Sequence, residues 1–414
     1  SSRGAGGKGR DMNSERLIDS FVTFAQISSP SRHEGAMARV LQPLLEELGF
    51  TVRFDDSAAA TGSDTGNLIA HLPGTVPGRI AFSAHMDTVE PCENIQVKRE
   101  MRPAGSLAQR PVDAAGNLFA EDDLVEVLCS AGNTILSGDD KAGLAAIIEG
   151  VRTTLEKGTP RPDIQLVFTT CEELSLLGAS ALPEDAFAPG TPCFVLDANG
   201  RPGSIVTQAP CHLTFFADFY GTAAHAGIEP EHGKSAIRMA AAAVDAMQLG
   251  RLNDHTTANV GYIMGGCTVN VVPEHCEVRG ECRSLIREEA LAQRDAMTAA
   301  MEKAAADGGG TVEVRWEFSY PEVAYDAEDP LVIRIKDAAR LAGLVPRRVK
   351  TGGGADANVM GEKGARAITL GIGMTDIHSE EEYIAVRDIE GCARLVQMLI
   401  ALYARDGQKA VAAG

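Results

Sequence analysis

The chain has 414 residues, 44% of them hydrophobic, and a formal net charge of -19 at pH 7. This length exceeds the roughly 250 to 300 residues at which a single hydrophobic core stops growing, so we expect two domains. The acidic balance argues against nucleic acid or an anionic membrane as a partner, because both attract basic patches.

Cysteine usage and the terminal segment set the expected compartment. The nine cysteines are odd in number and contain no CxxC pair, which is typical of free thiols in a reducing compartment, and we expect a cytoplasmic protein. No apolar run reaches the ~18 residues of a membrane span, and the start of the chain lacks the apolar core of a signal peptide. Residues 1–10 are expected to be a disordered leader or tag remnant, with Met12 as a candidate natural start.

The first third of the chain predicts two helices and then short strands. Residues 13–26 and 31–48 carry apolar side chains at helical spacing, on either side of a Ser-Pro-Ser break. Short strands are expected at 52–54 and 67–71, and a compact apolar strand at 79–83 leads into Ala84-His85-Met86-Asp87. Residues 92–133 carry no clear pattern of apolar residues. They could form a surface hairpin or a flap.

The next stretch combines acidic residues with the ends of apolar runs. Ser137-Gly138-Asp139-Asp140-Lys141 precedes an apolar helix at 144–151, where paired acids can be ordinary helix capping. A buried strand at 164–170 ends in Cys171-Glu172-Glu173, and a strand at 193–196 ends in Asp197.

Residues 212–318 change to a compact β-α-β-β-α-β order, which is typical of a ferredoxin-like module and indicates an inserted second domain. Its elements are expected at 212–220, 234–248, 258–264, 274–282, 288–306 and 311–318. From about residue 329 the α/β pattern resumes, with a helix at 330–342, a strand at 365–371 and a terminal helix at 388–403.

Polar residues at strand ends predict a metal site. In open α/β sheets ligands bind beyond the carboxyl ends of the strands, so these side chains can converge although they are far apart in sequence. His85 and His378 with several carboxylates suit zinc or a similar divalent ion, and a shared Asp139 would let two metals lie ~3.5 to 4 Å apart. Because neighbouring glutamates diverge, one of the Glu172-Glu173 pair is spare and is a candidate general base. Asp87 would accept the second N–H of the imidazole of His85.

These motifs, in order and spacing, resemble the dinuclear-zinc aminoacylase/carboxypeptidase metallopeptidase family over residues 14–404. Its peptidase T-like tripeptidase branch is the most similar, through Gly-Ile-Gly-Met before His378 and residues 380–383 after it. The resemblance implies a set of metal ligands: His85, bridging Asp139, Glu173, Asp197 and His378. It further implies Glu172 as the base and Asp87 as the orienting acid. In the inserted domain it implies that His225 reaches the scissile carbonyl in the neighbouring subunit's site, and that Asn270 and Arg283 contact substrate.

The resemblance implies an α/β fold: a mixed-sheet zinc-peptidase catalytic domain, residues 11–208 and 326–414, with an inserted ferredoxin-like lid and dimerisation domain at 209–325. The expected activity is metal-dependent removal of a residue from short peptides, in the manner of a tripeptide aminopeptidase. Two divalent ions per chain, zinc with cobalt or manganese as alternatives, and a homodimer formed through the lid are implied. One alternative function is an amidohydrolase that cleaves N-acyl amino acids at the same site. A less favoured alternative is a non-catalytic binding protein.

Overall fold

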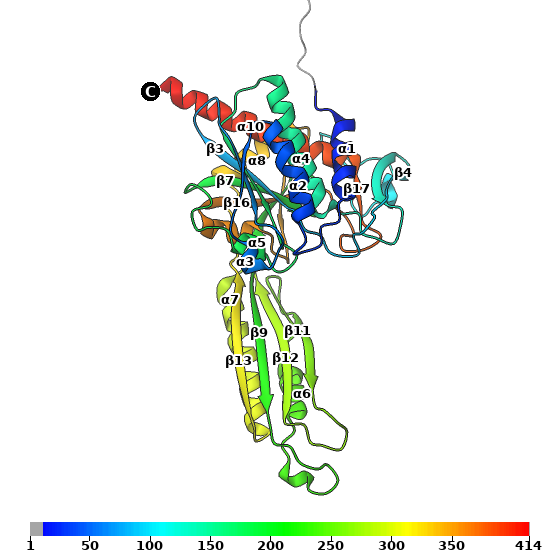
Figure 1. Cartoon of the computed structure of the whole chain (residues 1–414), viewed down its shortest axis with the longest axis vertical. Coiled ribbons are helices and arrows are strands. Elements are labelled where there is room, and N and C mark those ends of the chain that lie inside the picture. Colours follow the sequence, from blue (N-terminus) through cyan, green and yellow to red (C-terminus); the bar gives the residue numbers. More distant parts are fainter. Residues whose placement is uncertain (1–10, 414) are drawn as a thin grey trace, which may run out of the picture. The chain divides into compact units, whose positions relative to one another are not determined.

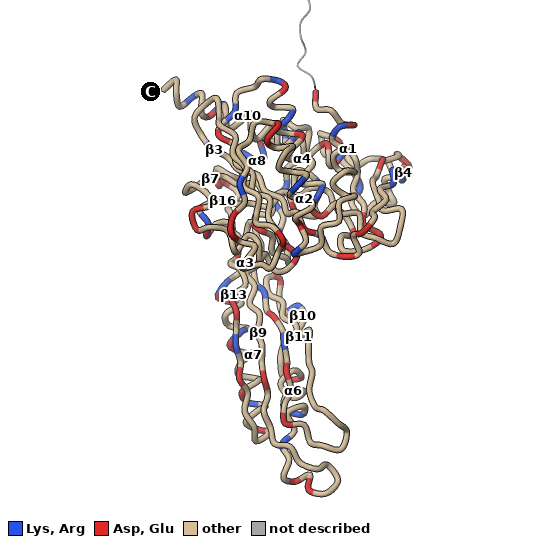
Figure 2. Tube along the Cα trace, in the orientation of Figure 1, with Lys and Arg blue, Asp and Glu red and all other residues tan. Residues whose placement is uncertain are grey.

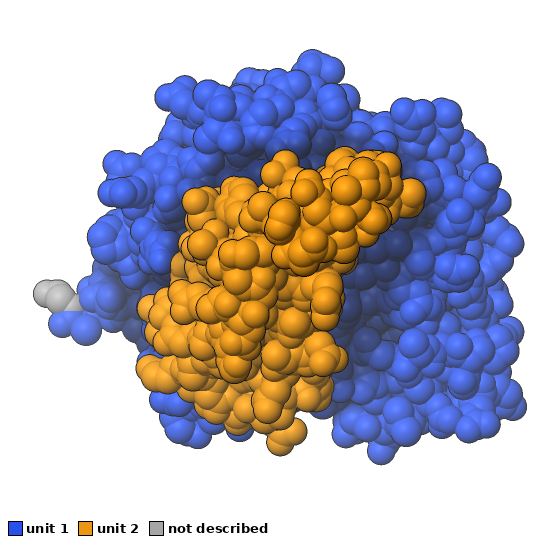
Figure 3. Space-filling model, turned by 90° about the horizontal axis from the view of Figure 1, so that it is seen from below, with its two compact units in different colours: residues 1–207, 325–349, 355–414 blue, residues 208–324, 350–354 orange. Residues whose placement is uncertain are grey.

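The computed structural model describes residues 11–413, which divide into two compact units (Figure 3). Unit 1 comprises residues 11–207, 325–349 and 355–413, and unit 2 comprises 208–324 and 350–354. The expected leader, residues 1–10, lies outside the described residues. Each unit has a hydrophobic core of its own. Unit 2 is therefore an insertion into the chain of unit 1, as the predicted fold class requires.

Amphipathic helices surround the sheet of unit 1 (Figure 1). The first begins where the side chain of Asn13 accepts a hydrogen bond from the backbone N–H of Arg16, which satisfies one of the free N–H groups at a helix start. Its buried face carries Leu17, Phe21 and Phe24. The helices of unit 1 are α1 (Ser14–Ala25), α2 (Gly35–Glu47), α3 (Ala58–Thr61), α4 (Gly138–Lys157), α5 (Leu177–Ser180), α8 (Pro330–Leu341), α9 (Ala357–Met360) and α10 (Val386–Ala413).

The larger sheet has a parallel centre and antiparallel flanks, with the order β1-β2-β6-β3-β7-β16-β8-β14 and with β15 paired to β8. Its strands are β1 (Thr51–Phe54), β2 (Leu68–Leu72), β3 (Arg79–His85), β6 (Asp163–Thr169), β7 (Thr191–Ala198), β8 (Ser204–Ala209), β14 (Val323–Ala324), β15 (Arg347–Lys350) and β16 (Ala365–Gly371). The pairs β3–β6, β3–β7 and β7–β16 are parallel. The carboxyl ends of these four central strands therefore meet at one edge of the sheet.

Helix α4 lies against β3 and β7 and packs on α1 and α10. The close approach of α4 to β7 depends on Gly143, because a Cβ atom at this position would lie 2.5 Å from the backbone carbonyl oxygen of Leu196. Phe82 and Phe194 fill the neighbouring core with ring centroids 5.6 Å apart. This packing fixes the start of α4 beside the carboxyl ends of the parallel strands.

Residues 92–133 contain an antiparallel hairpin, which is one of the two alternatives that the sequence allowed. It consists of β4 (Val97–Pro103) and β5 (Leu124–Ser130), and β5 also pairs with β17 (Tyr383–Ala385). Val125, Val127 and Tyr383 lie in a small apolar cluster of this sheet. The hairpin is thereby joined to the segment that follows His378.

Unit 2 is the predicted β-α-β-β-α-β module with one short additional strand. Its sheet has the order β10-β11-β12-β9-β13 and is antiparallel throughout. The elements are β9 (Cys211–Tyr220), α6 (Ala236–Ala246), β10 (Gly250–Arg251), β11 (Thr256–Gly265), β12 (His275–Ser284), α7 (Arg287–Asp307) and β13 (Thr311–Tyr320). Helices α6 and α7 bury Met239, Met297 and Met301 in a core shared with Phe215 and Phe219.

Charged residues are mixed along both units, with Asp and Glu interspersed among Lys and Arg (Figure 2). None of the helices between residues 11 and 413 is long and apolar enough to cross a membrane. All nine cysteines fall in this described range and are free thiols, and only Cys267 among them is exposed.

Candidate metal centre

The structure brings the predicted ligands together at the carboxyl edge of the parallel strands. Each comes from a different element: the end of β3, the start of α4, the turn after β6, the end of β7 and the loop after β16. In that order they are His85, Asp139, Glu173, Asp197 and His378. His85, Asp139 and Asp197 are almost fully enclosed, whereas the His378 side chain is 45% exposed.

Asp139 lies between the two imidazoles. Its Oδ1 is 2.9 Å from Nε2 of His85, and its Oδ2 is 3.1 Å from Nε2 of His378. Glu173 Oε1 is 2.9 Å from the same nitrogen of His378, and Asp197 Oδ1 is 3.6 Å from Nε2 of His85. Each imidazole thus faces one oxygen of Asp139 and at least one further carboxylate, which is an arrangement that a bridging ligand allows.

Asp139 and Asp140 do not act as ordinary helix caps. Both have non-helical backbone angles at the start of α4, and the peptide bond between them is cis. Asp140 Oδ2 accepts a hydrogen bond of 3.1 Å from the backbone N–H of His85. Asp140 Oδ1 is buried with no hydrogen-bond partner among residues 11–413.

Asp87 holds the other side of the His85 ring. The Nδ1 atom of His85 is 2.8 Å from the carbonyl oxygen of Asp87 and 3.2 Å from its carboxylate, so the backbone is the nearer acceptor. The Asp87 carboxylate also accepts from Ser31 Oγ and from the backbone N–H groups of Glu172 and Glu173. Burial opposes ionisation, but the hydrogen bonds from His85 and Ser31 keep the pKa of Asp87 below its usual value. Nε2 of His85 is left facing the other carboxylates.

The adjacent glutamates diverge, as expected. Glu173 contacts His378, and it forms with His85 and Asp139 a group whose ligand atoms all lie within 4.8 Å of one another. Glu172 Oε2 is 3.7 Å from Nε2 of His85, and within the described residues its carboxylate accepts no hydrogen bond. The Glu172 carboxylate therefore lies next to the ligand residues without a hydrogen bond to any of them.

The residues present fit divalent metal ions. Burial, with the nearby charge of Asp139, raises the pKa of Asp197 to about 7, and burial with the charge of Asp197 raises that of Glu172 well above its usual value. Such crowding of carboxylates is costly unless a cation compensates it. Imidazole nitrogens and carboxylate oxygens are the donors that zinc and similar ions take in hydrolytic sites.

Sequence reasoning missed two buried acids beside this cluster. Glu382 is 1% exposed and accepts hydrogen bonds from the backbone N–H groups of Leu136, Ser137 and Asp139 at 2.8 to 3.1 Å. Asp356 accepts from Thr169 Oγ1 at the end of β6, and burial raises its pKa to about 6. Glu382 belongs to the motif at residues 380–383 that follows His378. Neither Glu382 nor Asp356 comes at the end of an apolar run, and the metal ligands were predicted from acidic residues at such ends.

The three residues predicted for the inserted domain lie in unit 2. His225 is exposed, and its Nδ1 accepts from the backbone N–H groups of Gly227 and Ile228, so the ring proton of the neutral form is on Nε2. Asn270 is exposed, and its backbone carbonyl oxygen accepts a hydrogen bond from the backbone N–H of Ala226. The guanidinium of Arg283 donates to Glu281 and to the hydroxyl of Tyr320.

Comparison with known proteins gives consistent matches. The profile of Peptidase family M20/M25/M40 matches residues 137–402. The chain is 36% identical to the uncharacterized protein YqjE of Bacillus subtilis (strain 168), over 94% of this chain and 98% of that protein. It is similar to the crystal structure of aminopeptidase PepT from Bacillus cereus ATCC 10987, with 36% identity, a TM-score of 0.82 and coverage of 95% and 99%. A tripeptidase structure from Staphylococcus aureus gives 31% identity, a TM-score of 0.84 and the same coverage.

Proposed function

This chain belongs to peptidase family M20/M25/M40 and is a metallopeptidase, and from that premise we propose that it removes the N-terminal residue from short peptides such as tripeptides. The observation that carries the proposal is the position of Asp139 between the imidazoles of His85 and His378, with the Glu172 carboxylate free beside them. The aminopeptidase and tripeptidase structures support this substrate class.

We propose that two divalent ions are held per chain, with zinc preferred and cobalt or manganese as alternatives. Asp139 would be shared, His85 and Asp197 would complete one site, and His378 and Glu173 the other. When bound, such ions lower the pKa of a water molecule toward ~7 and polarise the scissile carbonyl. The donor set and the crowding of buried acids support this assignment.

The side chains around the cluster have distinct parts in the proposed reaction. Glu172 takes the proton of the attacking water and gives it to the leaving amine. Its raised pKa, caused first by burial and then by the charge of Asp197, makes the carboxylate a stronger base than an exposed glutamate. Asp87 fixes the orientation of His85 through its carbonyl and carboxylate oxygens.

Unit 2 contributes substrate contacts in this proposal. His225 of one chain acts on the carbonyl of a substrate held by a neighbouring chain, in a homodimer formed through unit 2. The proton on Nε2 supports this role, because only a donor can stabilise negative charge that develops on an oxygen. Asn270 and Arg283 contact the peptide, with Arg283 taking its carboxylate. The free cysteines support a reducing compartment, and we propose the cytoplasm.

A panel of peptides tests the proposal. Zinc-loaded protein is incubated with di- and tripeptides that have free or blocked amino termini, and with N-acyl amino acids, and the products are identified by mass spectrometry. We expect release of the first residue from free tripeptides and little cleavage of the blocked ones. Preferred hydrolysis of N-acyl amino acids would support the amidohydrolase instead, and no hydrolysis of any substrate would support a binding protein.

A further inference from the structure

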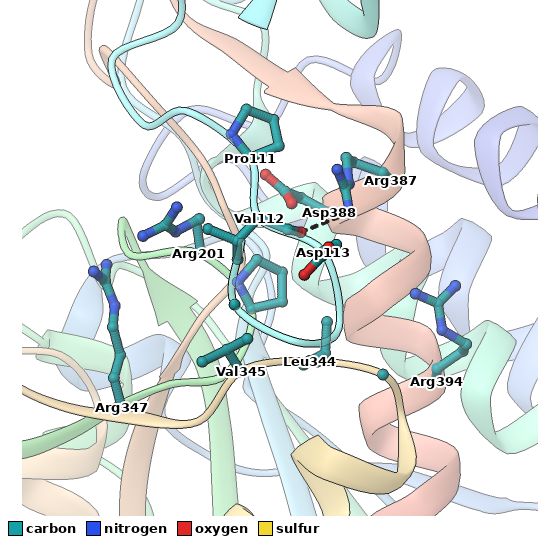
Figure 4. A pocket seen from close by; sticks show the side chains of 13 residues that line it. Pro111, Val112, Asp113, Arg201, Leu344, Val345, Arg347, Arg387, Asp388 and Arg394 are labelled. Carbon is teal, nitrogen blue, oxygen red and sulfur yellow. Dashed lines mark hydrogen bonds between the residues drawn. The ribbon is translucent and has the colours of Figure 1, made fainter. Parts of the chain in front are cut away.

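A cavity lined by both charged and apolar residues lies in unit 1, and none of the candidate metal ligands lines it (Figure 4). It has a volume of about 170 Å³, and several segments line it: the loop between β4 and β5, the turn after β7, the segment that leads into β15 and the first turns of α10. Four of its lining residues are arginines: Arg201, Arg347, Arg387 and Arg394. Such a concentration of positive charge is unexpected in a chain with a net charge of -19.

The four guanidinium groups are bound only to neutral acceptors. Arg201 and Arg387 donate to the carbonyl oxygens of Arg110 and Val112, and Arg394 donates to that of Ala342. Arg347 donates to the hydroxyl of Ser204. In the described part of the chain no ion pair joins any of the four to a carboxylate, and Nη1 of Arg387 is buried without a hydrogen-bond partner.

The arginines also repel one another. Burial, and then the neighbouring charges of Arg347 and Arg387, lower the pKa of Arg201. In Figure 4 Arg201 and Arg347 lie on one side of the cavity, and Arg394 lies on the opposite side. An anion that lies among these arginines would reduce the repulsion between them.

The two acids of the cavity compensate only part of this charge. Asp113 is engaged by its own loop, where it accepts from the backbone N–H groups of Ala115 and Asn117 and from the Asn117 side chain. Burial raises the pKa of Asp388 to about 7, against the opposing effect of Arg387 and Arg201. The cavity therefore keeps an excess of about two positive charges, or more where Asp388 is protonated.

We propose that this cavity is a binding site for a small phosphate-bearing anion, either inorganic phosphate or a phosphate monoester. A phosphate carries about -1.5 to -2 charge at pH 7 and offers oxygens in several directions, which matches guanidinium groups that arrive from separate segments. A carboxylate offers one charge and two coplanar oxygens. The volume of about 170 Å³ exceeds the ~30 Å³ that a water molecule occupies several-fold, so a phosphate group fits. The site does not depend on the peptidase activity.

Isothermal titration of the zinc-loaded protein at pH 7.5 and constant ionic strength tests the proposal. Inorganic phosphate, glycerol 3-phosphate and acetate are compared as probes. We expect saturable phosphate binding at one cavity site and no saturable binding of acetate. The tighter of the first two probes shows whether the free ion or the ester is the preferred ligand.

Variants assign the binding to the cavity. Arg347→Gln and Arg201→Gln should each weaken phosphate binding about tenfold or more, as loss of a charge-assisted contact predicts. Arg347 is exposed, so its replacement is compatible with folding, and circular dichroism verifies this. Arg53→Gln, at an exposed arginine on β1, is the matched control and should bind normally. Because phosphate can also bind metal, metal-free protein prepared with a chelator is titrated as well and should keep the site.

Three results would overturn the proposal. They are the absence of saturable phosphate binding, binding that Arg347→Gln and Arg201→Gln leave unchanged, and binding that removal of the metal abolishes. The last result would place the anion at the metal centre.

Discussion

The backbone N–H of Asp139 donates to Glu382 Oε2 at 3.1 Å. Glu382 thereby holds in place the residue that lies between the two imidazoles, although 243 positions separate the two in sequence. The other oxygen of Glu382 accepts from the N–H groups of Leu136 and Ser137. The acid therefore acts as a support for the whole loop that presents Asp139.

Replacing Glu382 by alanine should weaken metal binding about 10- to 100-fold, because residues that orient metal ligands typically contribute that much. Glu382→Gln keeps one acceptor oxygen and should have a smaller effect. Competition with a zinc-binding dye measures both affinities. Equal affinity in Glu382→Ala and the unmodified protein would show that the loop keeps its shape without this support.

Glu172→Gln should retain both metals and lose turnover by about 10²-fold or more, as expected for removal of a general base. Glu173→Gln should lose metal as well as activity, since its carboxylate contacts His378 and belongs to the ligand group. Peptide turnover and elemental analysis on the same samples separate the two roles. Near-normal turnover in Glu172→Gln would refute the assignment.

We expect two metal ions per chain after loading with excess zinc and desalting, since Asp139 presents one oxygen to each imidazole. His378→Ala should lower the plateau to about one. Elemental analysis against protein concentration gives the ratio. A plateau of one in the unmodified chain would contradict the dinuclear centre.

His225→Ala should lower turnover and leave the metal content unchanged, because His225 is not one of the proposed ligands and its ring nitrogen Nδ1 accepts hydrogen bonds from its own loop. Loss of one donor to a developing oxyanion costs ~3 to 4 kcal/mol in well-studied cases.

Mixing His225→Ala with Glu172→Gln under conditions of subunit exchange tests whether this residue acts across subunits. A mixed dimer combines an intact base from the first chain with an intact His225 from the second, so about one working site should return. Inactive mixed dimers, or a fully active monomer, would leave His225 as an ordinary surface histidine.

The buried carboxyl group of Asp388 should make the stability difference between the unmodified protein and Asp388→Asn depend on pH. Burial raises its pKa from 3.8 to about 7, so the folded chain keeps a proton that the unfolded chain releases. Stability from this group is complete below about pH 4 and is lost as the pH rises to about 7. The unmodified protein should therefore lose stability relative to Asp388→Asn across this range. Urea unfolding midpoints at pH 5 and 7.5 in phosphate-free buffer measure it, and a constant difference would be the contrary result.

Residue patterns alone determined much of this protein. The apolar runs that end in His85, in Cys171-Glu172-Glu173 and in Asp197 are central parallel strands. Their side chains meet because the carboxyl ends of parallel strands share an edge, which is a rule that local patterns can apply. The β-α-β-β-α-β order of unit 2 was likewise readable, since alternation and helical spacing are local properties.

Tertiary structure decided what depends on contacts between distant segments. That Asp139 presents one oxygen to each imidazole follows from a non-helical start of α4, which the apolar spacing of that helix does not reveal. The support by Glu382 and the gathering of Arg201, Arg347 and Arg387 around one cavity follow from how loops and helix ends pack together. Glu382 and Arg201 lie in loops, and Arg347 and Arg387 lie in the first residues of β15 and α10. Their partners are therefore fixed only by the three-dimensional path of the chain.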